Sequence, residues 1–246
     1  KKSLDSHYEI KKDIDCIETA EWNVDDCSSI KEKKSCSKKK SGCAWIKESE
    51  CENELFSGCA EKKDDCAEYC NGYWKKAGSC LDVNGFKPIG SRRKPFSGSL
   101  NGNGFTISNL SISRPKSNGV GLIGWSSGAV LQDLRILNAE IQGSITVGTA
   151  IGSMTEGRIE AVIAEKSSVN GVWGVGGLVG YARLNDTRSV IRSNAAYYCD
   201  IEGKGAIGGI VGRVDGGVLE ESASVGSSIK GIYGGGGLGG IAENTS

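Results

Sequence analysis

The sequence predicts an all-β chain built mainly as a parallel β-solenoid, a coil whose stacked turns pair strand on strand. A glycine-punctuated aliphatic phrase recurs five times after residue 118, as GLIG, TAIG, GLVG, GIVG and GLGG. Its closing glycines stand at 124, 152, 180, 212 and 240, in steps of 28, 28, 32 and 28 residues, and such a period is typical of stacked repeats. The chain has only three prolines, as expected where most strands donate their N–H groups to a neighbour.

The overall composition argues against two classes of function, nucleic-acid binding and membrane insertion. Thirty basic and thirty acidic residues cancel to a formal net charge of zero, so there is no electrostatic reason to expect nucleic acid as a partner. No stretch approaches the roughly 20 apolar residues that span a bilayer, so no membrane insertion is expected. The start, KKSLDSHYEIKKD, is too polar for a signal peptide and lacks an initiator Met. We therefore expect either a mature product or an expressed fragment, with any targeting segment removed.

Two stretches of different composition meet near residue 80. Residues 1–80 hold 32 charged residues, nine of the ten cysteines and four glycines. Residues 81–246 hold 28 charged residues, one cysteine and 33 glycines. The sequence therefore predicts a cap at 1–19, an inserted cysteine-rich module at 20–80, and the solenoid from residue 81 to the end.

The cap is predicted to contain a strand followed by a helix. Residues 7–10 are expected to form a short strand. Ile14 and Ile17 are an apolar pair at the i,i+3 spacing of a helix. A strand and a helix ahead of the first coil would cover the end of the solenoid.

The cysteines of the module predict a disulfide-stapled fold, because few apolar residues are available there to bury. Structural zinc is the alternative. Zinc sites prefer C-x-x-C pairs or cysteine–histidine sets, whereas the tightest spacing here is Cys66-x3-Cys70 and the only histidine is His7. Disulfides imply an oxidising compartment, so an extracellular or cell-surface location is expected. The predicted disulfide set is Cys16, Cys27, Cys36, Cys43, Cys51, Cys59, Cys66, Cys70, Cys80 and Cys199.

Cys199 is the one cysteine outside the first eighty residues. Nine cysteines leave one over, so either Cys199 reaches back to the module or both stay free. A free, buried Cys199 fits its apolar run, AAYYCDI at 195–201, where cysteine behaves as a small hydrophobe.

Aromatic residues make the module a candidate ligand-binding region. Trp45 is expected to pack over a disulfide, whereas Tyr73 and Trp74 follow Gly72 and would present flat rings on a loop. Exposed rings beside polar groups suit stacking on a sugar or docking on a protein. The module's candidate ligand-binding residues are Tyr73, Trp74, Lys75 and Trp45.

Three apolar runs make up each repeat. The glycine phrase comes first, a second run such as AVLQDLRI (129–136) follows, and a short third run such as AEIQG (139–143) ends in glycine. We expect about six coils of three strands each. One residue of the third run should form a ladder along the coil, because it recurs in step with the phrase. Its members are Ile141, Val169, Ile201 and Ile229.

The 32-residue step must carry four extra residues. The polar segment RLNDTR at 183–188 is the natural place for them, and solenoids carry such insertions on their outer surface. Arg183, Asn185 and Asp186 in this loop are further candidate ligand-binding residues.

The phrases GFKPIG (85–90), PFSGSLNGNGFTISNLSI (95–112) and VGGLVG (175–180) resemble the GLUG-repeat family of bacterial surface proteins. The resemblance covers about 8–17 and 81–246 and departs at 20–80, where the cysteine-rich module is an insertion. It implies a right-handed β-solenoid (β-helix) with 28-residue repeats and an adhesin-like, extracellular role. It brings no shared active site.

Three functions fit the sequence. The favoured one is an extracellular, adhesin-like binding module, at the tip of a fibre or surface protein, that recognises a glycan or protein on a target cell. The second is a structural spacer of a larger surface protein. The third is a β-helix carbohydrate-active enzyme, with Glu160 and Arg192 as neighbours on one outer face. Alternating charges between stacked coils also solvate a solenoid, so we expect no enzyme, catalytic residue, cofactor or metal.

The last expected coil, GGGGLGGIAENTS at 234–246, has no obvious cap. An open solenoid end exposes unpaired strand edges and invites association. A homo-oligomer, such as a trimer, or a covalent continuation of the chain is the expected partner at this end.

Overall fold

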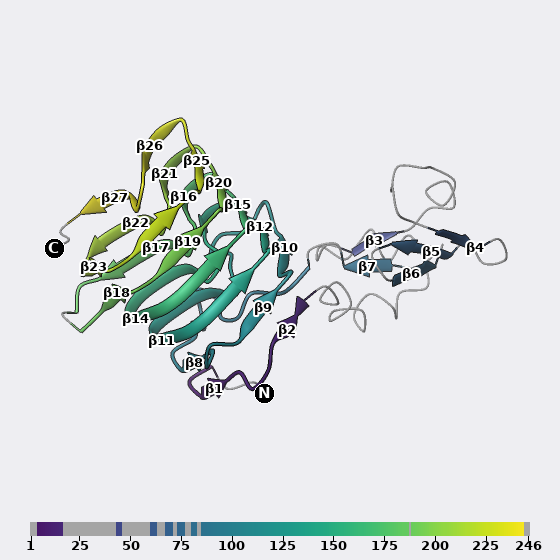
Figure 1. Ribbon diagram of the computed structural model, residues 1–246, viewed down its shortest axis with the longest axis horizontal. Coiled ribbons are helices and arrows are strands. Elements are labelled where there is room, and N and C mark those ends of the chain that lie inside the picture. Colours follow the sequence, from purple (N-terminus) through teal and green to yellow (C-terminus); the bar gives the residue numbers. More distant parts are fainter. Residues whose placement is uncertain are drawn as a thin grey trace. The chain divides into compact units, whose positions relative to one another are not determined.

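Figure 1 shows the computed structural model, which describes residues 4–16, 85–186 and 188–243 together with five short strands between residues 43 and 82. These residues form β-structure with no α-helix, and none of them belongs to a helix that could cross a membrane. The chain divides into two compact units. One comprises residues 1–17 and 86–246, and the other comprises residues 18–85.

The smaller unit contains two antiparallel sheets. One pairs β3 (Cys43–Trp45) with β7 (Cys80–Asp82). The other is formed by β4 (Ala60–Lys62), β5 (Ala67–Cys70) and β6 (Tyr73–Lys76).

The larger unit is a parallel β-solenoid whose strands pair with their counterparts in the next turn. Its first sheet contains β1 (His7–Glu9), β2 (Ile14–Asp15), β8 (Ser99–Asn101), β9 (Thr106–Ser108), β11 (Ile123–Leu137), β14 (Ile151–Glu165), β17 (Val179–Leu184), β18 (Val190–Arg192), β19 (Ala195–Tyr197), β22 (Val211–Gly216), β23 (Val218–Glu220), β24 (Ala223–Val225) and β27 (Gly239–Glu243). The second sheet contains β10 (Ser111–Ser113), β12 (Glu140–Gln142), β15 (Ser168–Asn170), β20 (Asp200–Glu202) and β25 (Ser228–Lys230). The third contains β13 (Ile145–Val147), β16 (Trp173–Gly176), β21 (Gly205–Gly208) and β26 (Tyr233–Gly236).

One turn of the coil crosses all three sheets, from β21 through β22, β23 and β24 to β25. The five strands of the second sheet correspond to about five turns, one fewer than the expected six. The expectation of three strands per turn is also wrong. The second apolar run is divided at Glu221, whose φ is 49°, and the third sheet adds a strand ahead of the glycine phrase.

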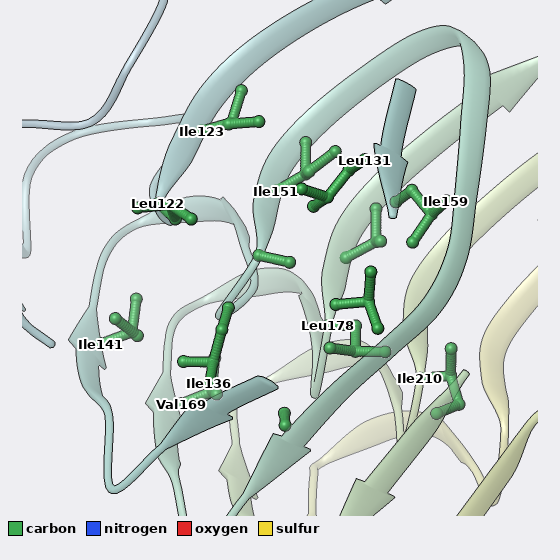
Figure 2. Close-up of a cluster of buried hydrophobic side chains, with 14 of the residues drawn as sticks. Leu122, Ile123, Leu131, Ile136, Ile141, Ile151, Ile159, Val169, Leu178 and Ile210 are labelled. Atoms are coloured by element: carbon green, nitrogen blue, oxygen red, sulfur yellow. The ribbon is translucent and has the colours of Figure 1, made fainter. Parts of the chain in front are cut away.

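Aliphatic ladders fill the interior (Figure 2). Leu131 and Ile159 pair in neighbouring turns and are both fully buried. The ladder predicted from the third apolar run is confirmed, and the structure extends it by Ile112 at its N-terminal end. Its members in order are Ile112, Ile141, Val169, Ile201 and Ile229. Burial of one such side chain contributes about 1.5–3 kcal/mol, so the ladders hold the turns together.

The closing glycines of the repeated phrase permit a close backbone approach. A Cβ at Gly180 would lie 2.3 Å from the backbone nitrogen of Val147, and one at Gly212 would lie 2.4 Å from that of Val175. Neither glycine has a positive φ. The phrase therefore ends in glycine because a third-sheet strand of the preceding turn packs directly on its backbone.

Two short strands pair with the start of the first turn. His7 of β1 pairs with Ser99, and Ile14 of β2 pairs with Ile107. The helix predicted from Ile14 and Ile17 is therefore wrong at Ile14, and Ile17 lies outside the described residues. Pairing with β9 engages the backbone of β2 and places Ile14 against the buried core, which outweighs a helical pattern of only two residues.

The four extra residues of the 32-residue step lie where the sequence predicted. Leu184 pairs with Gly216 and Val190 pairs with Val218, so six positions along one turn correspond to two along the next. The insertion is thus a loop between β17 and β18.

The prediction that Cys199 belongs to the disulfide set is wrong. Its thiol is free, and the residue is 1% exposed, with Sγ 3.6 Å from the carbonyl oxygen of Ala164. The physical reason is that Cys199 belongs to the solenoid core, where it packs as a small hydrophobic residue. This is the second of the two alternatives that the sequence left open. Cys16 is also buried. The side chains of the other eight cysteines lie outside the described part of the chain.

Candidate functional site

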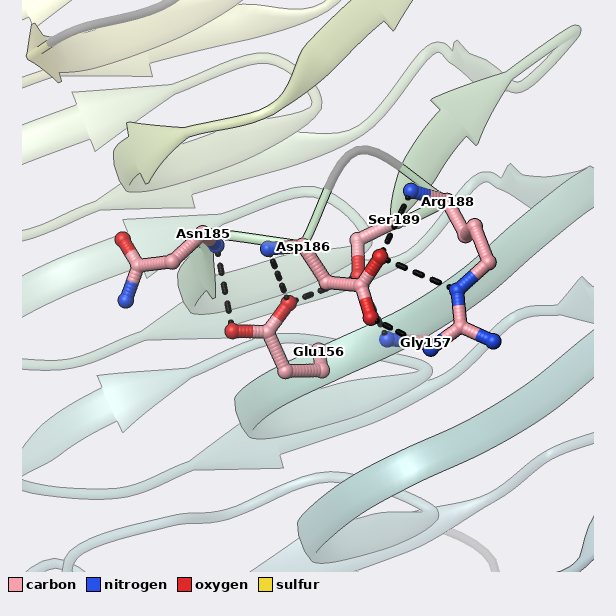
Figure 3. A network of polar contacts seen from close by, with 6 residues as sticks. All are labelled: Glu156, Gly157, Asn185, Asp186, Arg188 and Ser189. Carbon is pink, nitrogen blue, oxygen red and sulfur yellow. Dashed lines mark hydrogen bonds and ion pairs between the residues drawn. The ribbon is translucent and has the colours of Figure 1, made fainter.

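The loop between β17 and β18 is held down by Glu156 of the preceding turn (Figure 3). The Glu156 carboxylate accepts hydrogen bonds from the backbone N–H groups of Asn185, at 3.1 Å, and Asp186, at 2.9 Å. It also accepts one from the Ser189 hydroxyl, at 2.8 Å, and Ser189 Oγ in turn accepts the backbone N–H of Gly157. The start and end of the loop are therefore both fastened to one carboxylate.

Hydrogen bonds lower the pKa values of two carboxylates, Glu156 and Asp186. Burial raises the pKa of Glu156, but the hydrogen bonds from Asp186, Ser189 and Asn185 outweigh it and hold the pKa below its ordinary value. The side-chain hydrogen bonds from Arg188, followed by its backbone N–H, lower the pKa of Asp186 to about 2. Both groups are therefore ionised at neutral pH.

Of the three candidate ligand-binding residues of segment 183–188, Arg183 lies on β17 and not in the loop, because its backbone pairs with that of Asp215, and Asp186 is already engaged. Its carboxylate accepts the Arg188 side chain at 2.7 Å and 3.1 Å and the Arg188 backbone N–H at 2.9 Å. The side chains of Arg183 and Asn185 make no hydrogen bond or ion pair with the described residues. The loop and the end of β17 therefore offer one unengaged polar side chain each rather than a preformed pocket.

A second group of charges lies on the first sheet and pairs across the turns. The predicted neighbours Glu160 and Arg192 are confirmed, with 2.6 Å between Arg192 Nη2 and Glu160 Oε1. Arg192 Nη1 also lies 3.8 Å from Glu220 Oε1 in the following turn. These side chains are between 31% and 45% exposed, and ion pairs at such exposure contribute about 0–1 kcal/mol. The arrangement is a solvated charge ladder.

The outer surface of the second sheet has a different character. In β12, β15 and β20 the middle residue is buried and the two flanking residues are exposed, as alternation along a strand requires. We call the outward side chains of this sheet the polar face. Its two rows are Ser111, Glu140, Ser168, Asp200 and Ser228, and Ser113, Gln142, Asn170, Glu202 and Lys230.

The side chains of the polar face are almost all unengaged. Ser113 donates to Gln142 at 3.1 Å. No other side chain of the polar face makes a hydrogen bond or ion pair with the part of the chain that the structure describes. A shallow depression of about 300 Å³ lies over β10, β12 and β15. It is lined by Ser111, Ile112, Ser113, Glu140, Ile141, Gln142, Ser168 and Asn170.

Exposed apolar residues border the polar face. Ile145, Trp173 and Tyr233 each follow a second-sheet strand by three residues and share one register position of the third sheet. They are 41%, 38% and 65% exposed. Val172 and Ile232, the residues before two of them, are exposed as well, so this border holds five of the nine exposed large hydrophobic residues among those described. We call Ile145, Val172, Trp173, Ile232 and Tyr233 the apolar edge.

Trp173 is the largest side chain of the apolar edge and lies on a glycine. The register partner of Trp173 in the next turn is Gly205, and a Cβ at Gly205 would lie 2.4 Å from Cζ3 of the indole and 2.8 Å from its Cε3. The six-membered ring therefore occupies the space that a side chain at 205 would fill. This support fixes a broad aromatic surface beside the polar face.

Sequence reasoning did not find Trp173. The available signal was an apolar–aromatic–glycine triplet just ahead of the glycine phrase, VWG at 172–174 and IYG at 232–234. The side chains of the other candidates, Tyr73, Trp74, Lys75 and Trp45, lie outside the described residues. Within the described part of the chain no cluster of three or more His, Cys, Asp or Glu side chains could hold a metal ion.

Comparison with known proteins gives one partial likeness. No protein-family model matches the chain, and no solved structure matches it. A protein named halomucin, from Haloquadratum walsbyi, is 47% identical over 98 residues, which is 39% of this chain and 1% of halomucin. The matched region therefore spans about one hundredth of that relative's length.

Proposed function

We propose that this chain is a binding module of an exported surface protein, adhesin-like in role, which recognises a glycan or a protein through its polar face and apolar edge. The observation that carries the proposal is the contrast between two outer surfaces of one solenoid. On the first sheet Glu160, Arg192 and Glu220 engage one another. On the second sheet, apart from Ser113 and Gln142, the side chains of the polar face make no hydrogen bond or ion pair with the described residues.

The apolar edge supports the same proposal. Single exposed apolar residues are ordinary on a protein surface, but exposed apolar residues that share one register position beside polar residues support an interaction site. The stacked turns keep polar face and apolar edge in fixed relation, which lowers the entropy lost on binding. The partial likeness to halomucin and the resemblance to GLUG-repeat proteins are both compatible with a surface protein outside the cell. We propose binding without turnover, and no cofactor.

The alternative is a structural spacer, and one observation favours it. Leu238 in the last turn is 39% exposed, whereas Leu178 and Ile210, at the same position in the two preceding turns, are fully buried. A further turn of the solenoid or a second subunit stacked on this edge would bury Leu238. In that proposal the outer faces need no ligand.

Binding of the intact, oxidised chain to whole target cells and to an immobilised glycan and protein panel separates the two proposals. Saturable binding that survives the paired change Glu160→Gln with Arg192→Gln supports recognition away from the charge ladder. Loss of binding in that variant would place recognition on the first sheet instead. Absence of binding to every surface would favour the spacer.

A further inference from the structure

We infer that the ligand of this surface is an uncharged polysaccharide, which lies across the turns over β10, β12 and β15 and stacks a sugar ring on Trp173. The inference rests on the proposed binding function and names its site and ligand class. Four properties of the site lead to it: its hydrogen-bonding groups, its charge, its aromatic surface and its repeat.

The depression offers the hydrogen-bonding groups that sugar hydroxyls require. Apart from Glu140, its polar side chains are serines and amides, which both donate and accept hydrogen bonds. Ser111, Ser168 and Asn170 make no side-chain hydrogen bond to any described residue, so binding need not break an existing contact there. Each hydrogen bond gained adds modestly to affinity, and an extended chain gains several.

The charge of the depression selects against anionic ligands. Glu140 is its one carboxylate, and no Lys, Arg or His lines it. On the rest of the polar face, Asp200 and Glu202 outnumber Lys230. A uronate or sulfate group would approach negative charge without a compensating cation, which costs binding energy. Uncharged sugars carry no such penalty.

Trp173 supplies the apolar contact. The C–H groups on one face of a pyranose ring pack on a flat aromatic ring, while the hydroxyls around its rim reach polar neighbours. Trp173 follows Asn170 of the depression by three residues, across Gly171, and its ring is held on Gly205. A ring supported in this way is preorganised, so little side-chain entropy is lost when a sugar binds.

The repeat of the site favours a polymer over a single sugar. Ser113, Gln142 and Asn170 occupy one register position in successive strands, and parallel strands stack about 4.8 Å apart. Ile145 and Trp173 repeat in the same way along the apolar edge. A chain that runs along the solenoid axis meets the same kind of contact at each turn, whereas a monosaccharide meets one.

The test measures binding of the intact, oxidised chain to immobilised neutral glucans, mannans and galactans, with polygalacturonate and heparin as anionic probes. Trp173→Ala should weaken binding to the preferred neutral glycan about tenfold, and Trp173→Phe should restore most of it. Asn170→Ala and Gln142→Ala should each weaken binding about threefold to tenfold. Tyr8→Ala is the matched control, because Tyr8 is 41% exposed but lies on β1 of the first sheet, and it should bind like the parent chain.

Thermal melts of each variant distinguish loss of binding from loss of folding. If Trp173→Ala unfolds, the Asn170 and Gln142 variants still test the inference, because both side chains are exposed. Neutral-glycan binding that is unaffected by Trp173, Asn170 and Gln142 substitutions overturns the inference. Binding only to anionic glycans or to a protein also overturns it but leaves the proposed binding function intact. Absence of binding to any surface, including target cells, overturns both.

Discussion

Gly209 and Gly237 occupy the same position in consecutive turns, and the carbonyl oxygen of Gly237 lies 2.1 Å from where a Cβ on Gly209 would stand. Gly237 has no such neighbour, since nothing within 4 Å would meet a Cβ there. Neither residue has a positive φ. A Cβ on Gly209 would also lie 2.4 Å from Cβ of Ser224, which belongs to the same turn. Glycine is therefore required at 209 because the backbone of the next turn and the Ser224 side chain occupy the space of a Cβ.

The first prediction follows from this pair. Gly209→Ala should lower the free energy of unfolding by about 1–3 kcal/mol, because the Gly237 carbonyl of the next turn and the Ser224 side chain must both shift to admit a methyl group. Gly237→Ala is the matched control and should leave stability unchanged or slightly raised. Urea denaturation of both variants measures the difference, and equal midpoints would refute the stacking explanation.

The second prediction concerns Glu156. Replacement by Gln should destabilise the loop between β17 and β18 by about 1 kcal/mol, because the amide has one acceptor oxygen in place of two and its NH2 group would face a hydrogen-bond donor. Hydrogen exchange at Asn185 and Asp186 should become faster, since their N–H groups donate to this carboxylate.

The pH dependence of the same carboxylate has a defined sign. The folded-state pKa of Glu156 lies below its ordinary value of 4.5, so its stabilisation is complete above that value and is lost as pH falls through the lower folded-state pKa. Glu156→Gln should therefore remove part of the acid sensitivity of loop exchange. Glu202→Gln, at an exposed site, should not change it.

The third prediction compares two asparagines. Asn194 is 2% exposed, and its side chain accepts the Val162 backbone N–H at 2.9 Å and donates to the Ile159 carbonyl at 3.1 Å. Asn194→Ala should cost roughly 2–4 kcal/mol, because the Val162 N–H and the Ile159 carbonyl both lose this buried side-chain partner. Asn170→Ala should change stability by less than about 0.5 kcal/mol. Similar losses in the two variants would contradict the assignment of Asn194 as a structural residue.

The fourth prediction concerns the reactivity of Cys199. Burial raises the pKa of its thiol, and the thiolate is the form that reacts with alkylating agents. Iodoacetamide should therefore label Cys199 at least about tenfold more slowly in the native chain than in urea. Peptide mass spectrometry isolates this cysteine from the other nine. Rapid native labelling would show that the last turns open readily.

The sequence was informative where a side chain packs on the residue at the equivalent position of the next repeat. A position repeated every 28 residues stacks on itself in a parallel coil, so the ladder through Ile141, Val169 and Ile201 followed from spacing alone. The same arithmetic located the four-residue insertion and the contact between Glu160 and Arg192. These predictions needed no knowledge of how the three sheets face one another.

The sequence was least informative where a residue's neighbour comes from outside its own repeat position. Ile14 looked helical because only two apolar residues set the pattern, yet pairing with Ile107, far along the chain, made it a strand. The contacts of Glu156 with the inserted loop could not be predicted, because the insertion interrupts the period.

The sequence by itself determined that this chain coils, which residues stack inside the coil, and where the coil carries an insertion, because those properties depend on period alone. Only the tertiary structure decided which outer surface keeps its polar side chains unengaged. That depends on whether neighbouring side chains engage one another, as Glu160 and Arg192 do, or make no hydrogen bond to the described residues, as with Asn170. Such contacts join side chains of different turns, so no single repeat contains them.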